Sequence, residues 1–330
     1  MLILAYYFLF VTCLFKTTFS LSIPSNISTQ NKIPKINLQD LQKLLRNTKN
    51  SSGFDLDILK DGGGNLGVIE IASLGLDYRN ALKKLHENAP SCIGSVKSKV
   101  PGKIPLPDGS YRTTYATTTK TYLDCLDMDL LSQKFDEIDK TIIKVLNKFN
   151  EHYSNELNSN CSQLGYIVGD ETISIENALE KEHIHVYTTN KDKTIQPQNK
   201  NHSDFLVPFH VDNGLFLVIT PFPGHGMEVK LSTGFSVSTN QVSSDSALVL
   251  LGRGLTDWML SQNISSKKHL FAVPHSVPTL FGTEFETRTV YARMKVPPPN
   301  SITAMSTCSD FNGPEGRFES FFHLRYCLLF

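Results

Sequence analysis

Two residue types that bind transition metals stand at alternate positions in His210-Val211-Asp212. Alternate residues of a β-strand point to the same face of the sheet, so His210 and Asp212 can bind one ion together. A histidine supplied by a distant strand, His275, would complete a set of two imidazoles and one carboxylate. Such a set leaves coordination positions open and suits non-haem Fe(II). The spacing therefore predicts an iron site formed by His210, Asp212 and His275.

The apolar surroundings of this pair favour a metal over a solvent-exposed turn. A lone His-x-Asp is common at solvated strand ends, where it needs no ligand. Here residues 205–207 before the pair and 215–219 after it are strongly apolar. A buried imidazole and carboxylate need partners, and a cation supplies one. His275 also ends an apolar segment, and its alternative interpretation is a core histidine that is hydrogen-bonded to the backbone.

A cationic side chain, Arg288, stands on a strand face that is otherwise apolar. The alternation in residues 287–294 places it on the same face as Val290, Ala292 and Met294. A guanidinium there is costly unless it meets an anion, and its forked donors suit a carboxylate held by two hydrogen bonds. The anion is either a structural Asp or Glu or a bound dicarboxylate.

The segments that must position these residues change in character at about residue 165. Before this point, apolar spacing predicts strands and helices, namely strands at 33–38 and 66–71 and helices at 39–45, 78–87 and 130–152. After it, short apolar or alternating segments separated by Gly, Pro and Asn turns are typical of a sandwich, jelly roll or barrel. The predicted strands there are 183–188, 215–221, 227–231, 247–251, 270–274 and 287–294.

The N-terminal residues predict a cleaved secretory leader, with an uncleaved anchor as the alternative. Residues 2–15 form an uninterrupted apolar run that is too short for a comfortable membrane span, and small residues follow at Ser20 and Ser22. Asn-x-Ser sequons support the same interpretation, and they begin at Asn26, Asn50, Asn160, Asn201 and Asn263. We therefore expect residues 1–22 to be a signal peptide. The mature chain should enter the secretory pathway and be secreted or stay in the lumen of the ER or of a vesicle.

The cysteine content limits the number of disulfides, and the net charge bears on the kind of partner. Removal of the leader leaves five cysteines, which in an oxidising compartment allow up to two disulfides and one unpaired thiol: Cys92, Cys125, Cys161, Cys308 and Cys327. Lys plus Arg equals Asp plus Glu, at 32 each, so composition gives no electrostatic argument for a nucleic-acid partner. We expect no stable membrane span once the leader is removed, and the pattern specifies no oligomeric state.

The order of these motifs resembles the isopenicillin-N-synthase-like group of Fe(II)/2-oxoglutarate oxygenases. Residues 210–220 are similar to the family's first ligand strand, and 246–255 to the strand and turn before its second histidine. Residues 269–277 resemble the strand that carries that histidine. Upstream, 33–38 and 66–71 resemble the family's N-terminal strand and the motif after it. The resemblance thus spans nearly the whole mature chain up to about residue 299.

For the fold, the resemblance implies a mainly β protein with an α/β extension. Its core would be a double-stranded β-helix (jelly roll) formed by residues 166–300. A mixed α/β region at 23–165 would precede this core, and a C-terminal tail at 301–330 would follow it.

For the chemistry, the resemblance implies that His210, Asp212 and His275 hold Fe(II). It further implies that Arg288 binds the distal carboxylate of the cosubstrate 2-oxoglutarate, with Tyr187 as a second contact. The activity implied is the use of O₂ to hydroxylate, desaturate or cyclise a small-molecule substrate.

One position departs from the family's pattern and keeps two alternatives open. The family's arginine is usually followed two residues later by a serine, and here that position is Val290. Loss of a hydroxyl that bonds the keto acid costs about 1 kcal/mol. One alternative is a secreted jelly-roll binding protein that has lost turnover, and the other is a metal enzyme of the same fold that uses no keto acid. His183-x-His185 also has strand spacing for a metal, but no carboxylate completes it, and we interpret these histidines as exposed.

Overall fold

The computed structural model of the 330-residue chain describes twelve segments, which are residues 31–47, 55–95, 104–106, 110–117, 123–155, 165–168, 171–188, 205–222, 226–258, 268–279, 287–297 and 301–302. The predicted leader, all five sequons and three of the mature cysteines lie outside these segments. Within them, no helix combines the length and the apolar character that a membrane crossing needs.

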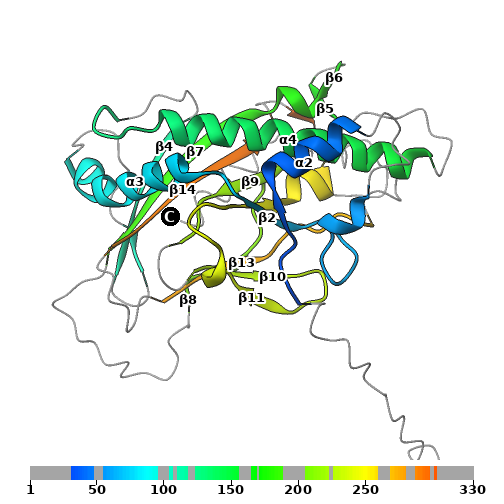
Figure 1. Ribbon diagram of the computed structural model, residues 1–330. Coiled ribbons are helices and arrows are strands. Elements are labelled where there is room, and N and C mark those ends of the chain that lie inside the picture. Colours follow the sequence, from blue (N-terminus) through cyan, green and yellow to red (C-terminus); the bar gives the residue numbers. More distant parts are fainter. Residues whose placement is uncertain are drawn as a thin grey trace, which may run out of the picture. The chain divides into compact units, whose positions relative to one another are not determined.

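Two main sheets and a short three-stranded one form the β part of the described residues (Figure 1). The larger has eight strands, in the order β1 (Lys35–Asn37), β2 (Val68–Ala72), β12 (Ala247–Leu251), β9 (Phe216–Ile219), β14 (Thr287–Val296), β7 (Leu179–Thr188), β4 (Tyr111–Thr117) and β3 (Ile104–Pro105). The smaller has four, in the order β11 (Ser236–Ser238), β10 (Glu228–Lys230), β13 (His275–Pro278) and β8 (Phe205–His210). Pairing within both is antiparallel except between β1 and β2. A separate three-stranded sheet joins β15 (Ser301–Ile302), β5 (Gly165–Val168) and β6 (Glu171–Ser174).

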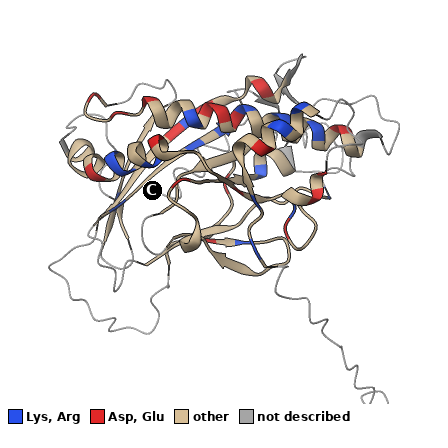
Figure 2. Cartoon of the chain, in the orientation of Figure 1, with Lys and Arg blue, Asp and Glu red and all other residues tan. Residues whose placement is uncertain are grey.

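Three α-helices cover one face of the larger sheet, and Figure 1 shows them on the side away from the smaller sheet. They are α2 (Leu38–Asn47), α3 (Leu76–Ser95) and α4 (Asp129–Asn155). Phe135, Ile138 and Ile142 of α4 recur at helical spacing and are buried, so each helix packs one apolar stripe against the sheet. The charged residues of the described segments are correspondingly numerous along the helices, whereas most of the strand ribbon is uncharged (Figure 2). Short helical turns complete the fold at η3 (Leu56–Leu59), η4 (Ile175–Asn177), η5 (Thr239–Gln241) and the π-helix η6 (Gly254–Trp258).

Apolar cores flank the larger sheet on both faces. The first lies between the sheet and the helices and includes Val249 and Tyr291. The second lies between the two sheets and includes Leu248 and Val290. Because successive strand residues point to opposite faces, neighbouring residues of one strand enter different cores. Burial on both faces accounts for the uninterrupted apolar sequence of strands such as β12.

Most of the predicted elements are present, with shifted ends. The strand predicted at 270–274 is wrong, because β13 begins at His275. Pro274 has no N–H to give to a ladder, and the segment before it makes isolated backbone bonds such as that from Val273 N–H to the carbonyl of Leu251 (2.9 Å). Strands β3 to β6, β11 and β15 were not predicted. The expectation that His210 and Asp212 lie on one strand is wrong, because β8 ends at His210 and Asp212 lies in the segment after it. Strands β1 to β4, from the predicted α/β extension, add to both edges of the larger sheet.

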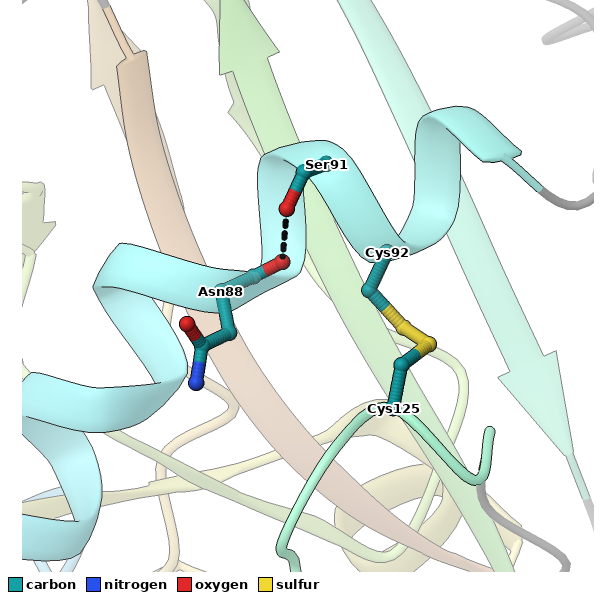
Figure 3. Close-up of a disulfide and its surroundings, with 4 residues drawn as sticks. All are labelled: Asn88, Ser91, Cys92 and Cys125. Carbon is teal, nitrogen blue, oxygen red and sulfur yellow. Dashed lines mark hydrogen bonds between the residues drawn. A yellow bond between two sulfur atoms is a disulfide. The ribbon is translucent and has the colours of Figure 1, made fainter.

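A disulfide joins Cys92 of α3 to Cys125, in the segment before α4 (Figure 3). The two Cα atoms are 5.8 Å apart, and 33 positions separate the residues in sequence. One residue before the bridge, the Ser91 hydroxyl donates to the carbonyl oxygen of Asn88 (3.0 Å). The bridge closes the loop that carries β3 and β4, and it therefore ties this edge of the larger sheet to two helices.

We expect the double variant Cys92→Ser/Cys125→Ser to lose about 3 to 4 kcal/mol of unfolding free energy, because a cross-link over a loop of this length restricts the unfolded chain by that amount. Urea denaturation of the variant and of the oxidised wild type measures the loss. Wild-type protein in reducing buffer should show the same loss. Equal denaturation midpoints for all three samples would contradict the prediction.

Candidate metal centre

Three potential metal ligands meet where β8 and β13 lie side by side. His210 ends β8 and His275 begins β13, and the two residues are directly paired in the antiparallel register. One ligand atom from each histidine and one from Asp212 all lie within 4.8 Å of one another. The carboxylate oxygens of Asp212 are 3.6 Å from Nε2 of His275 and 3.9 Å from Nε2 of His210. The structure thus brings the three predicted ligands together.

Backbone carbonyls determine which nitrogen of each histidine is available to a metal. Nδ1 of His210 lies 2.9 Å from the carbonyl oxygen of Pro208, and Nδ1 of His275 lies 3.1 Å from that of Val273. A carbonyl only accepts, so each Nδ1 carries the proton and each Nε2 presents its lone pair. Histidine ligands are commonly oriented by such a bond. Both Nε2 atoms are therefore free to bind an ion beside Asp212.

Burial favours the form of His275 that binds metals. His275 is only 6% exposed. Burial lowers the pKa of His275, and this effect outweighs the opposing influence of the Asp212 carboxylate. A neutral imidazole is the metal-binding form of histidine. His275 consequently needs no deprotonation at neutral pH.

The turn after β12 holds the backbone at Asp212. The N–H of Arg253 donates to the carbonyl of Asp212 and that of Gly254 donates to the carbonyl of Gly214, both at 2.8 Å. A Cβ added at Gly252 would overlap the Gly214 carbonyl oxygen and would lie 2.8 Å from that of Asp212. Glycine alone permits this approach. The turn at residues 252–254 thus holds the backbone at Asp212, and Gly252 permits the close approach.

The three ligands face a cavity of about 660 Å³ between the two sheets. Alternate residues of β4, β7, β9 and β14 line one side of it, and β8 and β13 line the other. Among the described lining residues, Asp212 is the single carboxylate, whereas Arg112, Lys181 and Arg253 carry positive charge. The cavity is consequently electropositive before any metal binds.

The two residues predicted to bind a cosubstrate are neighbours, but only one lines the cavity. Arg288 and Tyr187 are directly paired across β14 and β7, and Tyr187 lines the cavity whereas Arg288 is fully buried beside it. Nη2 of Arg288 donates to the carbonyl oxygens of Pro278 (3.2 Å) and Thr279 (3.5 Å). Burial raises the pKa of Tyr187, although Arg112 and Arg288 act in the opposite direction. The Tyr187 hydroxyl is therefore protonated at neutral pH and can donate a hydrogen bond.

His183 and His185 line the same cavity, and their interpretation as exposed residues is wrong. His183 is 7% exposed, and the two rings stack with centroids 5.6 Å apart. The smaller sheet covers this face of β7. Burial lowers the pKa of His183 to about 4 and lowers that of His185 well below its usual range. Nδ1 of His185 lies 2.8 Å from the Thr114 hydroxyl. The pair thus offers neutral polar groups to a ligand.

Arg112 was missed from the sequence because the strand that carries it was not predicted. Its segment reads Tyr-Arg-Thr-Thr-Tyr-Ala-Thr, in which aromatic and β-branched residues are typical of strands. Alternation places Arg112, Thr114 and Ala116 together on the cavity side. That pattern is the signal that could have found β4.

Comparison with known proteins identifies the fold. The sequence matches no protein-family model and no curated protein. A dioxygenase for auxin oxidation from rice matches 90% of this chain and 96% of its own length, at 16% identity and a TM-score of 0.52. A full-length Neurospora crassa protein, in complex with alpha-KG and thymine, matches 90% and 97% at 12% identity and a TM-score of 0.55. JOX2 in complex with 2OG, Fe and JA matches 90% and 84% at 13% identity and a TM-score of 0.50. The predicted jelly-roll fold is therefore confirmed.

Proposed function

We propose that this protein is an Fe(II)/2-oxoglutarate-dependent oxygenase of the isopenicillin-N-synthase-like group. It would use O₂ to hydroxylate, desaturate or cyclise a small organic substrate. The observation that carries the proposal is the meeting of His210, Asp212 and His275 at a cavity wall, with both Nε2 atoms available. The similar fold of structures that hold alpha-KG, or 2OG and Fe, supports it.

The ligand set fits Fe(II). Two neutral imidazoles and one carboxylate suit non-haem iron and occupy only one side of the ion. Bound iron would supply the remaining positions for a keto acid and O₂ together with the oxidising chemistry. The contribution of the chain is to hold these donors in place: His210 and His275 on paired strands, and Asp212 on the turn held by residues 252–254.

Arg288 and Tyr187 are the residues that we propose for the distal carboxylate of 2-oxoglutarate. They are adjacent on the cavity side of the larger sheet. A guanidinium supplies charge-assisted hydrogen bonds to a carboxylate, and the protonated Tyr187 hydroxyl supplies another. Val290 is buried and offers no hydroxyl. A keto acid bound here would thus lack one hydrogen bond of the family's pattern, a loss of about 1 kcal/mol.

The cavity size and lining favour a small organic substrate. Its volume of about 660 Å³ is within the range of roughly 300 to 1,000 Å³ that is usual for small-molecule sites. Phe222, Met227 and Leu217 give it an apolar surface, and His183 and His185 add neutral polar groups that can orient a ligand. The thymine bound to the Neurospora crassa protein and the JA bound to JOX2 are molecules of this size class.

We further propose that the protein works in the secretory pathway. The apolar run at 2–15 and the five sequons support this compartment. The Cys92–Cys125 disulfide supports it too, because disulfides persist in oxidising compartments. Secretion of an endoglycosidase-sensitive chain from eukaryotic cells tests the assignment, and a full-length unglycosylated product would contradict it.

A second candidate is a jelly-roll binding protein without turnover. The specific observation in its favour is that Arg288 donates to backbone carbonyls and does not line the cavity, while Val290 replaces the family's serine. Both features would weaken cosubstrate binding. The second candidate predicts that neither iron nor 2-oxoglutarate binds at the site.

Anaerobic addition of Fe(II) and then 2-oxoglutarate to the purified protein tests the proposed function. We expect a visible charge-transfer band when both are present and release of succinate when oxygen is admitted. His210→Ala should eliminate both signals, whereas the control His152→Ala, at the end of α4, should keep them. Iron binding without any effect of 2-oxoglutarate would assign an iron enzyme that uses no keto acid. Absence of both signals from the wild type would favour the binding protein.

A further inference from the structure

A second arginine stands at the level of Tyr187 in the cavity. Arg112 of β4 is directly paired with Tyr187 of β7, which is itself paired with Arg288 of β14 on its other side. Directly opposed residues of neighbouring strands project from the same face of a sheet. The three side chains therefore form one row across the larger sheet. Of the two arginines in this row, Arg112 is the one that lines the cavity.

No carboxylate of the described residues forms an ion pair with Arg112. Asp212 is the single described carboxylate on the cavity wall, and it belongs to the metal ligands. The positive charge of Arg112 acts to lower the pKa of Tyr187, against the effect of burial. The Nε–H of Arg112 is buried and has no hydrogen-bond partner among the described residues. A buried donor on a charged group that lacks an acceptor destabilises the protein. A ligand oxygen in the cavity would remove that cost.

We propose that Arg112 and Tyr187 form a subsite that binds a carboxylate of a ligand in this cavity. The planar guanidinium presents paired donors that match the two oxygens of a carboxylate, and Tyr187 adds a hydroxyl. The inference rests on the proposed function for the identity of the ligand: the carboxylate belongs to 2-oxoglutarate or to the substrate. Arg112 lies in the same row as Tyr187 and Arg288, and this position favours the distal carboxylate of 2-oxoglutarate. Arg112 would then bind that carboxylate together with Tyr187 and Arg288.

A cation of the neighbouring strand β7 provides a matched control for Arg112. Lys181 lines the same cavity but lies six residues from Tyr187 along the strand, which is about 20 Å at the usual rise of a β-strand. It therefore raises the potential of the same cavity without reaching the same carboxylate. Lys181→Gln removes one positive charge, as Arg112→Gln does, and separates a local contact from general electrostatics.

Calorimetric titration tests the subsite in two arms. The first arm titrates glutarate into metal-free protein and 2-oxoglutarate into the anaerobic Fe(II) form. The second titrates phenylacetate into protein loaded with Fe(II) and 2-oxoglutarate. We expect Arg112→Gln to lower the affinity for the two dicarboxylates by about 10- to 100-fold, which is the loss typical of a charged hydrogen-bonded pair. A loss of affinity for phenylacetate alone would also support the subsite and would assign it to a substrate carboxylate.

Two results would overturn the inference. One is an Arg112→Gln variant with unchanged affinity for every carboxylate that the wild type binds. The other is an equal loss in Lys181→Gln. Arg112→Lys, which keeps the charge and loses the planar fork, should recover part of the affinity, and this variant carries the test if Arg112→Gln does not fold. Failure of the proposed function is distinguishable, because it would remove the charge-transfer band and leave glutarate binding to the metal-free protein.

Discussion

Replacement of Asp212 with alanine should lower the affinity for Fe(II) by at least about 100-fold, because loss of a partner in the outer shell alone costs 10- to 100-fold. The variant removes the carboxylate from the cluster and leaves His210 and His275 as the only described ligands. Their Nε2 atoms stay available, since the carbonyls of Pro208 and Val273 still hold both rings. Equilibrium titration with Fe(II) under anaerobic conditions measures the loss.

The stability of the metal-free variant separates ligand loss from misfolding. The Asp212 side chain is partly exposed and lies 3.6 Å or more from the two imidazoles. We therefore expect the apo form of Asp212→Ala to unfold at the same urea concentration as the apo wild type. Asp77→Ala, an exposed position in the first turn of α3, serves as the control and should bind iron normally. A folded Asp212→Ala protein with wild-type affinity would refute the assignment of the site.

The three residues of the candidate metal site could be singled out because their signal is local. His210 and Asp212 interrupt a strongly apolar segment at strand spacing, and the alternation around Arg288 correctly separated the two faces of β14. The faces of β14 follow from the two-residue period of a strand. His210 and Asp212 meet without sharing a strand, because β8 ends at His210 and Asp212 lies in the segment after it. Several strands of the jelly roll were predicted instead from short apolar runs between turn residues, since burial on both faces removes the alternation.

The remaining features of the cavity depend on contacts between distant segments. His183 and His185 are buried because the smaller sheet covers β7. Arg112 reaches the cavity because β4 pairs with β7, and the paired residues Thr114 and His185 are 71 positions apart in the sequence. No local pattern specifies such pairings. The start of β13 depends likewise on Pro274 and on a bond to β12. The sequence thus identified the three residues that meet at the candidate metal site but not the groups that face them.

On the opposite face of β14, Arg293 connects the sheet to α4. It is fully buried, and its Nη2 lies 2.6 Å from a carboxylate oxygen of Glu182 on β7 and 2.7 Å from the hydroxyl of Ser132 on α4. Nη1 contacts Asp136 and lies 3.4 Å from Asp139, both on α4. This network joins α4 to β14 and β7. Both strands line the cavity on their other face, β14 through Ala292 and Met294 and β7 through its two histidines.

Arg293→Met should lower the free energy of unfolding by about 3 to 5 kcal/mol, because removal of one partner leaves the other charges of a buried network uncompensated. Glu182 and Asp139 are each only 2% exposed, so water cannot replace the guanidinium. Urea denaturation at pH 7 measures the loss. Addition of Glu182→Gln to the variant should recover part of it, since the double variant buries one unpaired charge fewer. A single variant as stable as the wild type would show that the network contributes nothing.

The pH dependence of this loss tests its cause. Burial raises the pKa of Asp139 to about 6, although Lys295 and Arg293 act to lower it. Because this folded-state pKa is above the usual value, ionisation of Asp139 opposes folding, and the penalty develops as the pH rises towards 6 and persists above it. Loss of Arg293 removes a lowering influence and raises the pKa of Asp139 further. The deficit of Arg293→Met should therefore be larger at pH 8 than at pH 5. An equal deficit at both values would assign the loss to packing, because the volume left by the guanidinium does not titrate.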